Sequence, residues 1–135
     1  LYIDQECSVI DPRLTVFEQT ERFNTGNWAK HELKSILNRY LFPYDTWDKG
    51  CACLSGGEKI RLLFCCLMIG NNAPDVFILD EPTNNLDIQS VEIITAAIKS
   101  YRGTVLLISH DHYFVKEIKI NRSIKLFDTG SVIKI

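Results

Sequence analysis

The chain has 135 residues, with 15 basic and 17 acidic side chains and a formal net charge of -2. Hydrophobic residues make up 46% of it and charged residues 24%, which is ordinary globular composition and excludes a disordered chain. The near-neutral charge gives no sign of a strongly basic nucleic-acid binder, and no apolar run approaches the roughly 20 residues of a membrane span. We therefore expect a folded domain without membrane insertion.

The first half of the chain is expected to be mostly helical. The predicted order there is the end of a strand over 1–5, a helix over about 15–23, a second helix through the apolar residues between 33 and 41, and an irregular segment over 42–53.

The second half alternates between helices and strands. The predicted order is a helix from 55 to about 70, a strand over 76–79, a helix from 87 to 103, a strand over 104–108, a short helix from 111 to about 119, and a hairpin of strands 123–127 and 132–135 with its turn at 128–130. Both inner strands are nearly continuous apolar runs, which is typical of strands buried on both faces of a parallel sheet. We therefore expect an α/β fold with parallel core strands, a helical first part and a C-terminal β-hairpin.

The five cysteines are an odd number, which argues against a closed framework of disulfides. Cys51 and Cys53 are close in sequence, but no second cysteine pair and no histidine stands at ligand spacing, so a zinc site is disfavoured. Reduced thiols are typical of a cytosol-like compartment. The sequence therefore favours a cytoplasmic protein.

The first chemical signal is Leu54-Ser55-Gly56-Gly57-Glu58 at the start of a predicted helix. Two glycines at this place let the backbone approach a ligand closely, and the free amides and the positive end of the helix favour an anion such as phosphate. Ser55 and Glu58 also have the spacing of a capping box. A simple helix cap is therefore the alternative to a phosphate site.

The second signal is the acidic pair after the apolar strand 76–79. Asp80 and Glu81 stand at the C-terminal end of that strand, where open α/β sheets bind their ligands. One carboxylate suits hydrated Mg²⁺, which prefers one or two carboxylates plus phosphates, and the other suits the polarisation of an attacking water. A solvated acidic loop is the alternative, and the apolar strand directly before the acids disfavours it.

Two further groups follow the same logic. His110, in ISHD (108–111), also stands at a strand end, so it is expected to face the same site as the acidic pair, although a lone histidine is more often structural. NNLD (84–87) taken alone is a turn and a helix cap at Asp87.

In this order, LSGGE (54–58), DEPTNNLD (80–87) and ISHD (108–111) resemble the signature, Walker B and switch motifs of the ATP-binding cassette (ABC) family. The resemblance covers about residues 3–135. LSGGEKIR and the doubled asparagine before Leu86 look like the ABC-F subgroup, whose members carry two cassettes in one chain, lack membrane domains and often act on the ribosome.

The resemblance implies a partial P-loop NTPase domain of the ABC type. A helical subdomain is expected over about 11–53. The signature helix, the Walker B strand, the switch histidine and the closing hairpin are expected over 54–135.

The resemblance also implies ATP and Mg²⁺ as cofactors of the intact protein. Asp80 would orient Mg²⁺ through water, and Gln5, which stands where the family has its Q-loop glutamine, would lie beside the metal and sense the γ-phosphate. Glu81 would act as general base on the attacking water, and His110 would contact the γ-phosphate.

A second set of residues is implied to act between two cassettes. The turn that carries Ser55, Gly56, Gly57 and Glu58 would close over ATP held by the opposite cassette. Asp87 would help communicate across that interface.

An ABC ATPase also needs a P-loop, G-x-x-x-x-G-K-[ST], and none of the seven glycines here is followed by lysine. In the family this loop lies upstream of the Q-loop glutamine, so we expect the chain to be a portion of a longer protein. The segment between Gln5 and Leu54 is too short for the long helical arm of a first ABC-F cassette, which favours a second cassette. Because the P-loop supplies the main grip on the phosphates, we expect no ATP hydrolysis by the isolated chain.

Expected partners are a second ABC cassette, in the same chain or in a dimer, and the ribosome or its RNA through the longer protein. The missing P-loop strand is expected to leave an apolar gap beside strand 76–79 and so to favour self-association of the isolated chain.

Three other functions remain open from the sequence. The first is the ATP-binding subunit of an ABC transporter, which the doubled asparagine disfavours. The second is a chromosome-type ATPase head, which needs long coiled-coil heptads that the sequence lacks. The third is a module that only binds partners.

Overall fold

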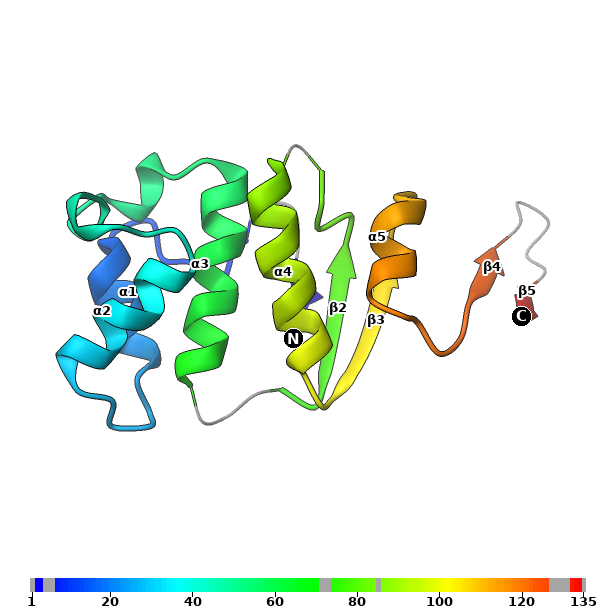
Figure 1. Ribbon diagram of the computed structural model, residues 1–135, viewed down its shortest axis with the longest axis horizontal. Coiled ribbons are helices and arrows are strands. Elements are labelled where there is room, and N and C mark those ends of the chain that lie inside the picture. Colours follow the sequence, from blue (N-terminus) through cyan, green and yellow to red (C-terminus); the bar gives the residue numbers. More distant parts are fainter. Residues whose placement is uncertain (1, 4–6, 71–73, 85, 127–131, 135) are drawn as a thin grey trace.

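The fold is taken from a computed structural model that describes residues 2–3, 7–70, 74–84, 86–126 and 132–134 (Figure 1). Its elements are, in chain order, β1 (Tyr2–Ile3), α1 (Val16–Phe23), α2 (Lys30–Arg39), two 3-10 turns (Tyr44–Thr46 and Cys51–Cys53), α3 (Gly56–Ile69), β2 (Val76–Asp80), α4 (Ile88–Ser100), β3 (Thr104–Ile108), α5 (His112–Glu117), β4 (Ile124–Leu126) and β5 (Val132–Lys134). None of the helices in these ranges is long and apolar enough to cross a membrane.

The helices begin where side chains satisfy free backbone amides. The N-cap residues of α1, α3, α4 and α5 are Thr15, Ser55, Asp87 and Asp111. At α1 and α3 the box is complete, because a glutamate three residues on accepts a hydrogen bond from the backbone N–H of the cap residue. The helix starts predicted at 55, 87 and 111 are therefore confirmed.

Strand β2 lies in the middle of a three-stranded parallel sheet in the order β1-β2-β3. Ile78 of β2 is opposite Tyr2 on one side and Leu106 on the other. The predicted α/β fold with parallel core strands is confirmed. The C-terminal hairpin is also present, because β4 and β5 pair antiparallel, and its predicted turn at 128–130 lies outside the described residues.

The predicted gap beside strand 76–79 is wrong. Both sides of β2 are paired, and the outer edges of the described sheet belong to β1 and β3. The position of a strand in the chain does not reveal its neighbours in a sheet, and the short segment Tyr2–Ile3 occupies the place that the sequence analysis left empty.

The prediction that the inner strands are buried on both faces is also wrong. Phe77 is buried, whereas Val76 is 44% exposed and Leu106 and Ile108 of β3 are 48% and 50% exposed. Successive side chains of a strand point to opposite faces. The described helices pack on the face that carries Phe77, whose ring lies 6.4 Å from that of Phe64 in α3. The other face is therefore only partly covered.

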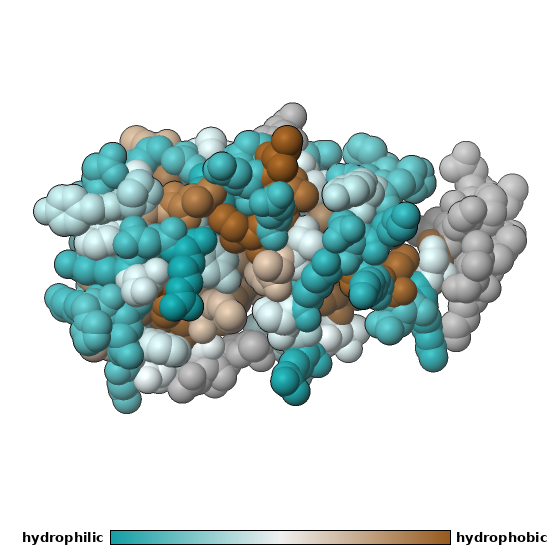
Figure 2. Space-filling view, viewed as in Figure 1, coloured by the Kyte–Doolittle hydropathy of each residue, from teal (hydrophilic) through white to brown (hydrophobic). Residues whose placement is uncertain are grey.

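Helix α3 is the centre of the core. Its buried residues are Ile60, Arg61, Leu62, Leu63, Phe64, Cys65, Cys66 and Ile69. Figure 1 shows α3 between the α1–α2 pair and α4. On the face seen in Figure 2, hydrophobic side chains show between the helices, and hydrophilic ones cover their outer surfaces. A helix that is apolar nearly all round is one that is enclosed on all sides.

All five cysteines are free thiols, and four of them are buried. Burial raises the pKa of the Cys51 thiol to about 11, and it raises the pKa values of Cys65 and Cys66 as well. These thiols are therefore neutral apolar groups of the core at physiological pH.

Candidate active site

Strands β2 and β3 end side by side, and the polar motifs leave the sheet at the same level. Asp80 is opposite Ile108 in the parallel ladder. The ladder continues for one more bond, in which the backbone N–H of Glu81 donates to the carbonyl of Ile108 at 2.8 Å. The turn after β2 and the turn after β3 are therefore held together from their first residues.

The structure brings Glu81 and His110 into direct contact. Glu81 Oε1 lies 2.7 Å from His110 Nδ1, and it also accepts the backbone N–H of His110 at 3.2 Å. The carboxylate side chain is 18% exposed and the imidazole 78% exposed. The hydrogen bond to Glu81 and the charge of Glu81 raise the pKa of His110 above its ordinary value.

The second carboxylate oxygen of Glu81 is in a different position. Oε2 is buried, and no donor among the described residues reaches it. The backbone of Glu81 has φ 47°, in the left-handed region that a non-glycine residue seldom adopts. Such backbone persists where its surroundings impose it, and it occurs often at active sites. One oxygen is therefore fixed by the histidine, and the other remains a buried acceptor.

A second contact links the two turns. Thr83 Oγ1 lies 3.5 Å from Asp111 Oδ2. The other oxygen of Asp111 accepts the backbone N–H groups of Tyr113 and Phe114 at the start of α5. The turn after β2 is therefore linked through Thr83 to Asp111, the residue that caps α5.

The signature turn, residues 54–58, closes on itself. Ser55 Oγ accepts the backbone N–H of Glu58 at 3.2 Å, and Glu58 Oε2 accepts the backbone N–H of Ser55 at 2.8 Å. Glu58 Oε1 pairs with Lys49 Nζ at 2.8 Å. Burial alone raises the pKa of Glu58, but the hydrogen bonds from Lys49 and Ser55 outweigh it and hold that pKa below its ordinary value. Both oxygens of Glu58 are thus used within the chain.

The two signature glycines have different surroundings. A Cβ on Gly57 would lie 2.8 Å from Cδ2 of Leu86, so a larger residue there would displace the end of the Leu86 side chain, whereas a Cβ on Gly56 would meet nothing within 4 Å. Gly57 therefore lets α3 approach Leu86 closely. Gly56 and Ser55 lie on the exposed surface.

Asp87 caps the start of α4. Its carboxylate accepts the backbone N–H and the hydroxyl of Ser90 at 2.8 and 2.7 Å. The Ser90 N–H, then the Ser90 hydroxyl, and after them the charge of Arg61 lower the pKa of Asp87, against the opposite effect of desolvation. Asp87 is thus a helix cap whose pKa is also lowered by the positive charge of Arg61 in α3.

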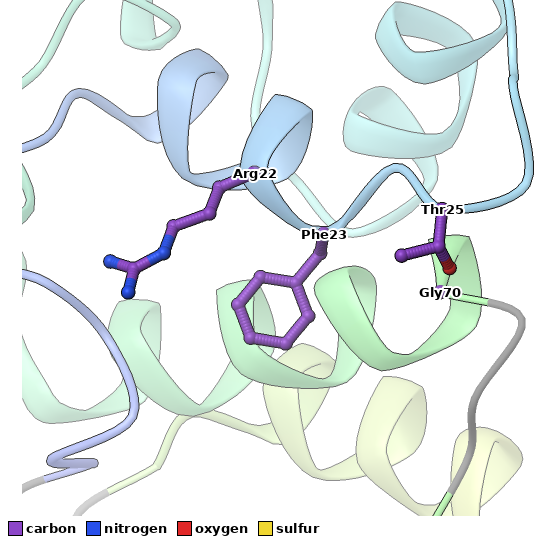
Figure 3. Close-up of a pocket in the computed structure, with 4 residues that line it drawn as sticks. All are labelled: Arg22, Phe23, Thr25 and Gly70. Carbon is purple, nitrogen blue, oxygen red and sulfur yellow. The ribbon is translucent and has the colours of Figure 1, made fainter.

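Gln5, which the sequence analysis placed beside the metal, lies outside the described residues. A shallow hollow of about 270 Å³ between the ends of α1 and α3 is lined by Arg22, Phe23, Thr25 and Gly70 (Figure 3). Gly70 is the C-cap of α3, whereas the signature turn begins that helix, so the hollow is at the opposite end of α3 from the signature turn.

Sequence analysis gave no role to two buried polar residues. Gln19 of α1 is fully buried, and its Oε1 accepts the backbone N–H of Asp11 at 3.2 Å, which anchors the segment after β1. Arg61 of α3 is 9% exposed. No local pattern marks either residue, because their partners lie far away in the sequence.

Comparison with known proteins identifies the family. A model of the ABC transporter family matches residues 1–84. ABC transporter F family member 5 of Arabidopsis thaliana is 42% identical over 128 residues, which cover 94% of this chain and 18% of that protein. ABC transporter F family member 2 of the same plant is 45% identical over 104 residues, which cover 77% of this chain and 15% of that protein. The chain therefore spans less than a fifth of the length of these relatives.

Solved structures agree on the fold. The ATP-binding cassette MJ0796 bound to ADP and Pi has a TM-score of 0.70 at 21% identity, over 98% of this chain and 61% of that one. The RNase-L inhibitor has a TM-score of 0.69 at 20% identity, over 99% of this chain and 26% of that one. The chain belongs to the ABC transporter family and has the P-loop NTPase fold of its cassettes. The resemblance to the F subgroup is confirmed by the sequence relatives.

Proposed function

We propose that the protein that contains this chain is an ATP hydrolase (ATPase) of the ABC-F type, and that this chain supplies its general base, switch histidine, metal-side acid and signature turn. The observation that carries the proposal is the Glu81–His110 pair at the joint end of β2 and β3, with Glu81 Oε2 buried and without a donor among the described residues. A carboxylate that a histidine holds in place at the strand ends is suited to act as a general base toward a water molecule.

The residues present fit Mg²⁺ and ATP in part. Asp80 is a half-buried carboxylate at the strand end, and Mg²⁺ takes one or two carboxylates together with phosphate oxygens. The printed sequence contains no P-loop, so the main grip on the phosphates is not among its residues. Bound Mg-ATP would supply the reacting phosphoryl group and neutralise its charge. Asp80 would hold the metal through water, with Gln5 on the metal side.

Glu81 does the proton chemistry in this proposal. Its Oε1 is held by His110, and the carboxylate would take the proton of the water that attacks the phosphate. The imidazole of His110 is exposed in the turn after β3, where it would contact the γ-phosphate. A positioned general base contributes roughly 10²–10⁴-fold to a rate.

The signature turn acts on a second nucleotide. Ser55 and Gly56 are exposed at the start of α3, where free amides and the helix dipole favour phosphate. Gly57 keeps α3 close to Leu86, and Glu58 holds the shape of the turn through Ser55 and Lys49. We infer that ATP bound by a second cassette is closed between this turn and that cassette, and that Asp87 helps communicate across the contact.

The test uses the full-length protein. Glu81→Gln keeps the shape of the side chain and removes the base, so ATP hydrolysis should fall by about 10²-fold or more while ATP still binds. Glu92→Gln removes an exposed glutamate of α4 and serves as the matched control, with wild-type turnover. Undiminished hydrolysis in Glu81→Gln would refute the proposed role. The isolated 135-residue chain should show no turnover, and turnover that vanishes in its Glu81→Gln variant would contradict this expectation.

A role on the ribosome is the finer part of the proposal. It is supported by the ABC-F relatives and by a structural neighbour of 22% identity and TM-score 0.69, a complex of the archaeal ribosomal stalk protein aP1 with the archaeal ribosome recycling factor aABCE1. Full-length Glu81→Gln should sediment with ribosomes in ATP and be released in ADP. Sedimentation that is the same in both nucleotides, or none, would count against a nucleotide-dependent ribosomal role.

Two smaller points complete the proposal. The free thiols support a cytoplasmic location, which cell fractionation tests. Self-association of the isolated chain is still expected, now through β3, which has exposed Leu106 and Ile108 and no charged residue. A clean monomer by light scattering at high concentration would count against it.

A further inference from the structure

Arg61 is a charged side chain inside the core. It lies in the middle of α3 and is 9% exposed. Charged residues are almost never buried unless they are paired, because removing a charge from water is costly. The structure pairs Arg61 with no carboxylate among the ion pairs of the described residues. A buried salt bridge therefore does not explain why the Arg61 side chain is buried.

One side of Arg61 holds the end of α2. Nη1 donates to the carbonyls of Tyr40 and Leu41, both at 3.3 Å, and the guanidinium lies 5.3 Å from the centre of the Phe42 ring. Leu41 has φ 60°, so the chain leaves α2 through a left-handed residue. A cation at the C-terminal end of a helix satisfies free carbonyls and complements the helix dipole. Arg61 therefore fastens the end of α2 to α3.

The turn of α3 just before Arg61 lies close to Leu86. Gly57 and Arg61 are four residues apart, so they lie on one face of α3. Gly57 is close enough to Leu86 that a Cβ would lie 2.8 Å from its Cδ2. The positive charge of Arg61 also acts on the next residue, Asp87, whose pKa it helps to lower. One face of α3 thus touches the 84–87 turn through Gly57 and attracts Asp87 through Arg61.

The Nε donor of Arg61 differs from Nη1, which is hydrogen-bonded to the end of α2. Nε is buried, and it has no hydrogen-bond partner among the described residues. Buried polar groups are nearly always hydrogen-bonded, and the exceptions need an explanation in terms of strain, chemistry or an absent partner.

We propose that Arg61 is a positioning residue that couples the signature turn to the 84–87 turn and to the end of α2. The inference rests on the proposed ATPase function. When the signature turn contacts ATP of the second cassette, α3 carries Arg61 with it, and Arg61 transmits the shift to the Tyr40–Leu41 carbonyls and to Asp87. Arginine differs from lysine here because its planar guanidinium can lie against the Phe42 ring while Nη1 donates to both carbonyls, whereas a lysine ammonium has no planar face.

The experiment measures ATP hydrolysis and thermal unfolding in the full-length protein. Arg61→Met keeps the packing on Phe42 and removes the charge and both hydrogen bonds, and Arg61→Lys keeps the charge as a milder variant. Both should lower kcat, Arg61→Met by about 10-fold, with little change in KM for ATP. Lys59→Met, which removes a charge from the same turn of α3 outside the core, should behave as wild type.

A double-mutant cycle separates coupling from simple destabilisation. If Arg61 acts through Asp87, Arg61→Met in an Asp87→Asn background should lower kcat much less than it does in the wild type. Additive effects, or a wild-type kcat in Arg61→Met, would overturn the proposal. So would a loss of kcat that disappears on cooling and follows the unfolding midpoint of each variant. A wild-type protein without ATPase activity, or one insensitive to Glu81→Gln, would instead overturn the proposed function and this inference with it.

Discussion

The helical side of the molecule and the strand ends use their side chains differently. In α3, Leu62 and Leu63 are fully buried, and the signature turn satisfies its own polar groups through Ser55 and Glu58. In the sheet, Leu106 in the middle of β3 is half-exposed, and at the strand ends one oxygen of Glu81 has no donor among the described residues. The stability of the chain therefore comes mainly from the helical side, and the groups suited to chemistry lie where packing is incomplete.

The largest expected effect tests the packing side of this contrast. Leu63→Ala removes a side chain that is 0% exposed, so the free energy of unfolding should fall by about 2–5 kcal/mol through lost burial and a residual cavity. Leu106→Ala removes the same atoms from a side chain that is 48% exposed, so it should cost less than about 1.5 kcal/mol. Urea unfolding of the isolated chain measures both. Equal losses would mean that the two regions are packed alike.

A smaller effect tests the polar side of the helical region. Thr15→Ala removes the hydroxyl that accepts the backbone N–H of Glu18 at 3.2 Å, so the free energy of unfolding should fall by about 1 kcal/mol. Ser35→Ala, on the exposed surface of α2, is the matched control and should change it by less than about 0.5 kcal/mol. If both variants unfold at the same urea concentration, the cap of α1 contributes nothing.

The smallest effect concerns protonation at the strand ends. Glu81 raises the pKa of His110 above 6.5, so the protonated pair is favoured in the folded state. Its contribution to stability is fully present below pH 6.5 and is lost as pH rises through the raised pKa. Glu81→Gln should therefore shift the NMR titration midpoint of the His110 imidazole downward. An unchanged midpoint would show that the two side chains do not interact in solution.

Local features of the fold could be predicted because their causes are local. Ser55 and Glu58 are three residues apart, and each accepts a backbone N–H of the other, so the start of α3 follows from a short segment. The end of α4 was missed for the opposite reason. It comes at Ser100 and not at Gly103, because the chain turns out of the helix at Tyr101, whose ring packs 4.4 Å from that of Phe77 in β2. No pattern within α4 contains that contact.

The residues of the candidate site could be predicted from the sequence, but the contact between Glu81 Oε1 and His110 Nδ1 could not. That Glu81 and His110 follow strand ends could be inferred from apolar runs, and the resemblance implied their roles. Which oxygen of Glu81 meets which nitrogen of His110 depends on residues 29 positions apart in the chain. The contact of Arg61 with the Tyr40 carbonyl could not be predicted for the same reason, because the two residues are 21 positions apart.

The sequence by itself determined the order of strands and helices, most helix starts, and the three motifs that mark the family, since each depends on neighbouring residues. Tertiary structure alone decided that β2 is central and β3 lies at an edge, and that one face of the sheet is only partly covered. It also decided that Glu81 Oε2 is buried without a donor among the described residues, and that Arg61 of α3 donates to the carbonyls at the end of α2. Strand neighbours and buried charges depend on contacts between distant segments, which form only when the chain folds.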